Sequence, residues 1–140
     1  PWHGFSRDIS GTADWDLVIN FDFLEHSYEP YHDLGVCNAL LKDGGLLYLK
    51  TLYMDNPDHL LKGDCYQLFG QGHFHYFRVR TLLAMIANAG FKILKVQLGP
   101  LVFVYGQKVG EPAARDRLDL RFLNENYNYL QIRHRQPHGD

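Results

Sequence analysis

The sequence has few cysteines, no long apolar run and almost no net charge. Cys37 and Cys65 are the only cysteines among 140 residues and lack C-x-x-C spacing, so we expect no disulfide framework but reduced thiols in a cytoplasmic protein. No apolar run approaches the roughly 18 residues that a membrane-spanning helix needs, and no signal-peptide pattern is seen. The formal net charge is −2 and the pI about 6.5, so we expect neither nucleic-acid nor membrane binding.

What the chain does contain is apolar and aromatic side chains in quantity. Hydrophobic residues make up 46% and aromatic residues 14% of the sequence, which excludes a disordered tail. A chain of this length forms one domain and buries about two-thirds of its unfolded surface. We therefore expect a single folded domain with a real core.

Apolar runs and helical spacing predict an α/β order of elements. The run at 14–20 predicts a strand, buried on both faces as in a parallel sheet that helices cover on both sides. A helix is expected at 31–41, with Gly44 as its left-handed cap, and a second strand at 45–52. The next helix has apolar side chains at i, i+3, i+4 and i+7 and ends at Gly90; its members are Val79, Leu82, Leu83 and Ile86.

The remaining elements are two strands and a long loop. Strands at 91–97 and 101–107 are joined by Leu-Gly-Pro, a link short enough only for an antiparallel hairpin. The segment 53–77 has no clear period, and a loop of that length in a compact domain is typical of a functional site.

Ionisable side chains gather directly after the first strand. Asp22, Glu25, His26 and Glu29 lie within eight positions. In open α/β sheets, ligands bind beyond the carboxyl ends of the strands, so this position indicates a site.

Three segments together resemble a known family. "WDLVINFDFLEHSYEP", "LLKDGGLLYLKT" and "HYFRVRTLLAMIANAGFKI" are similar, in this order, to the second half of a class I S-adenosylmethionine-dependent methyltransferase. The resemblance implies a Rossmann-like sheet with a terminal antiparallel hairpin, S-adenosylmethionine as cofactor, and methyl transfer to a small-molecule acceptor. The resemblance spans roughly residues 8–107, and we expect part of a methyltransferase domain at 1–108 and a C-terminal extension at 109–140, partly helical or frayed.

The sequence departs from the family pattern in the residues that bind the methyl donor, S-adenosylmethionine. The glycine-rich turn and the acidic residue that hold the cofactor have no counterpart here. The strand at 14–20 would have only 45–52 as a neighbour, which leaves a bare apolar edge. We therefore expect a half-domain, completed by a missing N-terminal half or by a partner chain.

The resemblance also implies roles for particular residues. His26 is the candidate catalytic base, because imidazole takes up protons near neutral pH; the alternative is that it caps the next helix or bonds a backbone carbonyl. Cofactor contacts are expected at the adenine and at the end of the first strand, from Asp8, Ile9, Asn20 and Phe21. Substrate contacts are expected from Glu25, Tyr53, His73 and His75.

A metal site is the main alternative for these ionisable groups. Small-RNA 2′-O-methyltransferases and ubiquinone-pathway O-methyltransferases use E-x-x-E-H and a later histidine for a divalent cation. The similar residues here are Asp22, Glu25 and His26, with His73 or His75, and such ligands suit Mg, Mn or Zn. The same spacing is ordinary at the start of a helix, where acids are favoured, so we predict no metal.

Two further functions compete with methyl transfer. One is a non-catalytic methyltransferase-like module that binds or regulates, which the missing glycine turn favours. The other is an NAD-dependent oxidoreductase, which the terminal hairpin argues against. Five of the eight arginines lie in the last 30 residues, and we interpret them as a solvated helix face.

Overall fold

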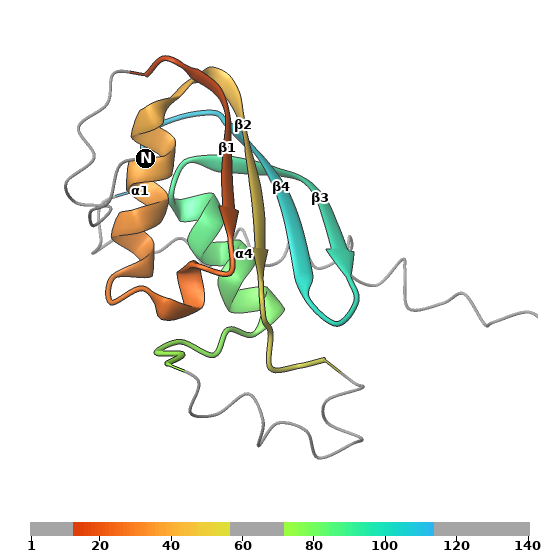
Figure 1. Ribbon diagram of the computed structural model, residues 1–140. Helices are drawn as coiled ribbons and strands as arrows, with labels where there is room; N and C mark the ends of the chain where they lie inside the picture. Colours follow the sequence, from red (N-terminus) through yellow and green to blue (C-terminus); the bar gives the residue numbers. More distant parts are fainter. Residues whose placement is uncertain (1–12, 57–71, 114–140) are drawn as a thin grey trace, which may run out of the picture.

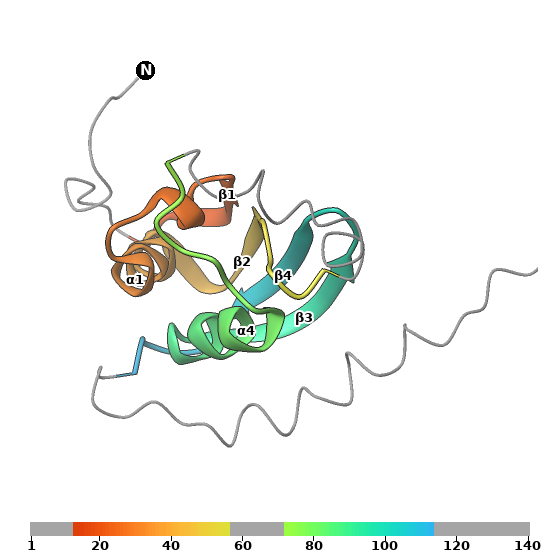
Figure 2. The same cartoon turned by 90° about the horizontal axis from the view of Figure 1, so that it is seen from below.

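The computed structural model describes residues 13–56 and 72–113, which form a four-stranded sheet with two helices on one face (Figures 1 and 2). No helix in these two ranges is long and apolar enough to cross a membrane. The elements in chain order are β1 (Trp15–Phe21), the 3₁₀ turn η2 (Leu24–His26), α1 (Pro30–Leu40), β2 (Leu41–Thr51), α4 (Val79–Asn88), β3 (Phe91–Leu98) and β4 (Val102–Lys108).

The sheet has the order β1-β2-β4-β3. β1 runs parallel to β2, whereas β4 is antiparallel to both β2 and β3. The parallel core and the terminal antiparallel hairpin predicted from the sequence are therefore confirmed. The crossover from β1 to β2 through α1 places the carboxyl ends of both strands at the same edge of the sheet.

The end of α1 differs from the prediction. The helix ends at Leu40 and β2 begins at once, so Gly44, at φ +78°, lies within β2 and does not cap the helix. The reason is a buried lysine: the amino group of Lys108 donates to the carbonyl oxygens of Asn38 at 3.1 Å and Leu41 at 3.0 Å. The lysine cation bonds to the last carbonyls of the helix, which a glycine cap would otherwise help to satisfy.

The core lies between the sheet and the two helices. Alternate strand residues face the helices, as the two-residue period of a strand requires. The fully enclosed side chains include Leu34 from α1, Leu82 and Ile86 from α4, and strand residues such as Leu47, Leu49, Phe91, Val102 and Val104.

The opposite face of the sheet is not covered by any helix of the described ranges, so the expectation that β1 is buried on both faces is wrong. Every second residue of β1 faces this open side and is 39–61% exposed: Trp15, Leu17, Ile19 and Phe21. Across the register, Leu17 pairs with Leu46, and Ile19 with Tyr48. β1 also has β2 as its one neighbour among the described strands, so the expected bare apolar edge is present.

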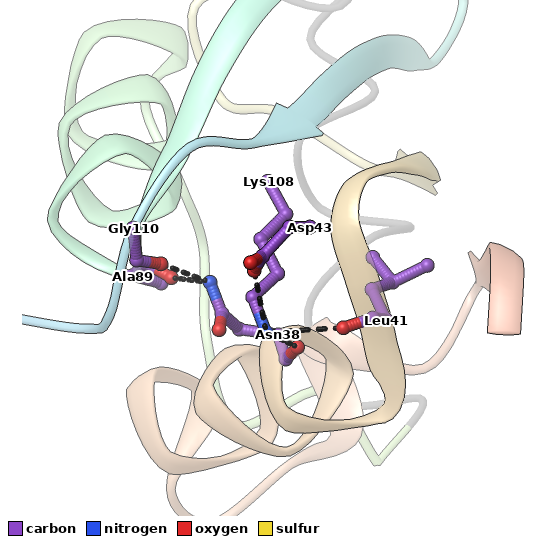
Figure 3. A network of polar contacts seen from close by, with 6 residues as sticks. All are labelled: Asn38, Leu41, Asp43, Ala89, Lys108 and Gly110. Carbon is purple, nitrogen blue, oxygen red and sulfur yellow. Dashed lines mark hydrogen bonds and ion pairs between the residues drawn. The ribbon is translucent and has the colours of Figure 1, made fainter. Parts of the chain in front are cut away.

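A polar junction ties the ends of α1, α4 and β4 together (Figure 3). The side-chain amide of Asn38 donates to the carbonyls of Ala89 and Gly110, each at 2.9 Å. Lys108 adds its two carbonyl contacts, and the carboxylate of Asp43 lies 4.0 Å from its amino group. Gly90 packs against this junction at φ +87°, where a Cβ would lie 2.2 Å from the carbonyl oxygen of Gly110.

We predict that Gly90→Ala unfolds the protein more easily. A left-handed alanine costs about 1–3 kcal/mol, and the clash with the Gly110 backbone adds to that cost. Urea denaturation should show a lower free energy of unfolding. Gly110→Ala is the matched control, because a Cβ there meets nothing within 4 Å. Equal stability of the two variants would contradict the close approach at Gly90.

Candidate functional site

The chain turns sharply after β1. Asp22 adopts φ +47°, its N–H donates to the carbonyl of Lys50 at 3.0 Å, and its carboxylate pairs with the Lys50 amino group. The following 3₁₀ turn buries Glu25 and leaves His26 exposed. The acid and the imidazole thus lie just beyond the carboxyl end of β1.

Glu25 joins three segments of the chain. Its Oε2 accepts a hydrogen bond from the Thr51 hydroxyl, at the end of β2, at 2.7 Å. Its main-chain carbonyl accepts from the N–H groups of Phe74 at 2.8 Å and His75 at 3.1 Å. The carboxylate is only 3% exposed, so these contacts hold the 72–77 segment against the end of the sheet.

The contacts of His26 fix its tautomer. Its Nδ1 lies 2.9 Å from the carbonyl oxygen of Gly72, which can only accept, so Nδ1 must carry the hydrogen. In the neutral ring, Nε2 then holds the free lone pair. The ring also lies against that of His73, with centroids 4.6 Å apart.

Three residues come together in a geometry that could hold a metal ion. One ligand atom each from Glu25, His26 and His73 lies within 4.8 Å of the others. One carboxylate with two imidazoles is a donor set that suits zinc and similar divalent cations. Asp22 and His75 are not in this group: Asp22 pairs with Lys50, and His75 stacks on Phe77 at 5.7 Å.

The expected cofactor residues lie at the end of β1 or outside the described residues. The Asn20 side chain is buried beneath α1, where its amide lies 3.8 Å from Cys37 Sγ and its oxygen has no partner among the described residues. Burial raises the pKa of the Cys37 thiol to about 11, which keeps it protonated. The Phe21 ring packs edge-on against Tyr48 at 4.8 Å. Asp8 and Ile9 lie outside the described residues.

The structure does not group Tyr53 with the cluster. Its side chain is 3% exposed, and its hydroxyl donates to the carbonyl of Gly99 in the turn between β3 and β4. A substrate contact by Tyr53 stays a prediction.

Two residues of the site had not been predicted. Thr51 orients the Glu25 carboxylate, and the Gly72 carbonyl sets the His26 tautomer. Thr51 could have been found, because parallel neighbouring strands bring their carboxyl ends together. Gly72 has no such signal, since the contact depends on the path of a loop.

The comparisons with known proteins agree with this architecture. The methyltransferase domain family matches residues 5–96, so the chain belongs to that family. The comparison with curated proteins gives no significant match. The family match confirms the predicted class I methyltransferase, a class that uses S-adenosylmethionine, and it disfavours the oxidoreductase alternative.

Solved structures share the fold. An S-adenosylmethionine-dependent methyltransferase of Thermotoga maritima is 16% identical with a TM-score of 0.60, over 75% of this chain and 62% of its own. A Haloferax volcanii methyltransferase, solved with an activator protein, is 13% identical with a TM-score of 0.63, over 79% and 61%. The 1,6-didemethyltoxoflavin N1-methyltransferase of Burkholderia thailandensis is 16% identical with a TM-score of 0.59, over 75% and 48%. The chain thus spans less than two-thirds of each of these relatives.

We predict that Thr51→Val destabilises the protein. The variant keeps the side-chain shape but leaves a buried carboxylate without its hydroxyl donor, and hydrogen bonds to charged groups contribute about 1.5–3 kcal/mol. Thermal and urea melts should show this loss. Thr81→Val, on the exposed side of α4, is the control and should change stability by less than about 0.5 kcal/mol. Similar stability of the two variants would show that Thr51 does not support Glu25.

Proposed function

We propose that the protein transfers the methyl group of S-adenosylmethionine to a small-molecule acceptor. The observation that carries this proposal is the Glu25, His26 and His73 cluster at the carboxyl end of β1, in a domain of the methyltransferase family. The Burkholderia relative was solved with a small acceptor and S-adenosylhomocysteine bound, which supports an acceptor of that kind.

In this proposal His26 takes the acceptor's proton. The acceptor's lone pair attacks the methyl carbon, the carbon–sulfur bond breaks, and S-adenosylhomocysteine leaves with that electron pair. The proton of the acceptor's hydroxyl or N–H goes to Nε2 of His26, the nitrogen left free by the bond to Gly72. Glu25 and His73 lie close enough to stabilise the resulting imidazolium.

The donor side requires further polypeptide. The described residues contain no glycine-rich turn between a strand and a helix, and β1 exposes an apolar row along the sheet edge. We propose that an N-terminal half or a partner chain adds a strand beside β1 and completes the cofactor site. The relatives' greater length supports this, as does the activator bound to the Haloferax methyltransferase. A non-catalytic module remains the second candidate, because the same turn would be absent from it.

We predict that the protein, supplied with the polypeptide that completes its donor side, binds S-adenosylhomocysteine and not NAD in calorimetric titrations, with circular dichroism to confirm folding. The match to the methyltransferase domain family is the basis for this preference. Binding of NAD alone would contradict the proposal. A folded chain that binds neither would favour the non-catalytic module, unless adding the completing polypeptide restores binding.

We predict that His26→Asn lowers methyl transfer about 100-fold or more, without weakening S-adenosylhomocysteine binding. The asparagine amide can still donate to Gly72 but cannot take the proton. Radiolabelled methyl transfer to small phenols and amines measures the loss. His32→Asn is the control, since His32 is an exposed residue of α1. A reduced affinity for the product with unchanged turnover would instead make His26 a cofactor contact.

The same assay separates a base from a metal ligand. If His26 acts as a base, prior dialysis against EDTA and later addition of Mn²⁺ or Zn²⁺ should leave turnover unchanged. Turnover that depends on the cation, and is lost in Glu25→Gln, would instead establish a metal at the three residues grouped by the structure.

A further inference from the structure

Two large aromatic side chains beside the cluster are unusually exposed. Tyr28 is 77% and Phe74 52% exposed, and their rings stack on each other with centroids 4.5 Å apart and planes 27° from parallel. Because both rings are exposed, they contribute less to stability than apolar side chains that are buried in the core. Contiguous exposed aromatic surface next to a functional site is typical of a ligand-binding wall.

The same two segments build this ring pair and the ionisable cluster. Tyr28 follows His26 by two residues, and Phe74 follows His73 directly. The N–H of Phe74 is bonded to the carbonyl of Glu25, so the ring and the buried acid are held together through the backbone. The rings of His26 and His73, which are tilted by 48°, and the stacked rings of Tyr28 and Phe74 are thus two neighbouring aromatic pairs between the same segments.

The two segments offer no lysine or arginine to an anion. Segments 20–28 and 72–77 contain two carboxylates, those of Asp22 and Glu25, and no lysine or arginine. Lys50, the cation beside them, is paired with Asp22. Glu25 makes no ion pair with a lysine or arginine of the described ranges, so neither side chain is held at the cluster to bind an anionic group.

We infer that the methyl acceptor is a planar aromatic compound without negative charge, held against Tyr28 and Phe74 with its hydroxyl or N–H group toward His26. This inference rests on the proposed function and adds the class of acceptor to it. The ring pair supplies stacking, the imidazole takes the proton, and the two segments provide no lysine or arginine that would pair with an anion.

The first test compares three probes by calorimetric titration of the full chain. Naphthalene-2,3-diol is aromatic and neutral, its 6-sulfonate is aromatic and anionic, and cis-1,2-cyclohexanediol carries the hydroxyls without the ring. We expect measurable binding of the neutral diol, at least tenfold weaker binding of the sulfonate, and none of the cyclohexanediol. Equal affinities across the three would overturn the inference.

The second test changes the ring itself. Phe74→Leu keeps the apolar volume and the backbone N–H but removes one face of the stack, and aromatic pairs contribute about 0.5–1.5 kcal/mol beyond burial. The Kd for the neutral diol should rise roughly 2- to 13-fold on that range. Tyr105→Leu is the matched control, because Tyr105 forms a stack of the same 4.5 Å separation with Tyr48, on the helix-free face of the sheet. An unchanged Kd in Phe74→Leu, or an equal rise in Tyr105→Leu, would contradict the assigned wall.

Titration with S-adenosylhomocysteine separates this inference from the function on which it rests. Product binding without diol binding would reject the aromatic acceptor and leave methyl transfer intact. Diol binding that is sensitive to Phe74→Leu, in a protein that stays unable to bind the product even with the completing polypeptide, would keep the aromatic site and reject the transferase. Methylation of the neutral diol, with a raised KM in Phe74→Leu, would support both.

Discussion

The buried Lys108 and Asn38 hold the structure together at one end of the sheet. Their donors bond to carbonyls at the ends of α1 and α4 and just beyond β4, three segments that meet in the interior. Removing the Asn38 side chain would take this donor from the carbonyls of Ala89 and Gly110. Removing that of Lys108 would take it from Leu41 and Asn38, although the Leu41 N–H would still donate to Asn38. This junction lets β2 follow α1 without a connecting turn, so α1 can cross back over the sheet and lay β2 parallel to β1.

Glu25 plays the corresponding part at the other end. β2 runs from Leu41, at the lysine junction, to Thr51, which donates to the Glu25 carboxylate. The register of β2 therefore decides whether Thr51 reaches the acid, and the acid's own carbonyl decides where the 72–77 segment lies. The candidate site is thus positioned by the same strand that the junction anchors, with Leu41 at one end of β2 and Thr51 at the other.

The sequence predicted those parts of the fold that short-range pattern controls. Three features were predicted correctly because neighbouring residues determine them: the apolar run of β1, the helical spacing of α4 and the short link between β3 and β4. The prediction that Gly44 caps α1 was wrong, because Lys108, which is far away in the sequence, bonds to the carbonyls at the end of the helix. At the site, Glu25 and His26 were found from their place after a strand. His73 was proposed from the loop, but its selection over His75 depends on which ring meets His26. The sequence could not show which of the two histidines faces His26, because the segment 72–77 belongs to no helix or strand and so has no regular side-chain period.

The uncovered face of the sheet bears on how the site could work. Phe21 ends both the apolar row and β1, so the exposed strand leads directly to the ionisable cluster that follows it. A strand added beside β1 would pair with its open backbone edge and bring its own carboxyl end to the same end of the sheet. Covering the apolar face of β1 is a separate requirement, because Leu17 and Ile19 point out of the plane of the sheet and need an element packed on that face. The crossover helix that joins two parallel strands is an element of that kind, so the completing polypeptide would close the edge with its strand and cover the face with its helix.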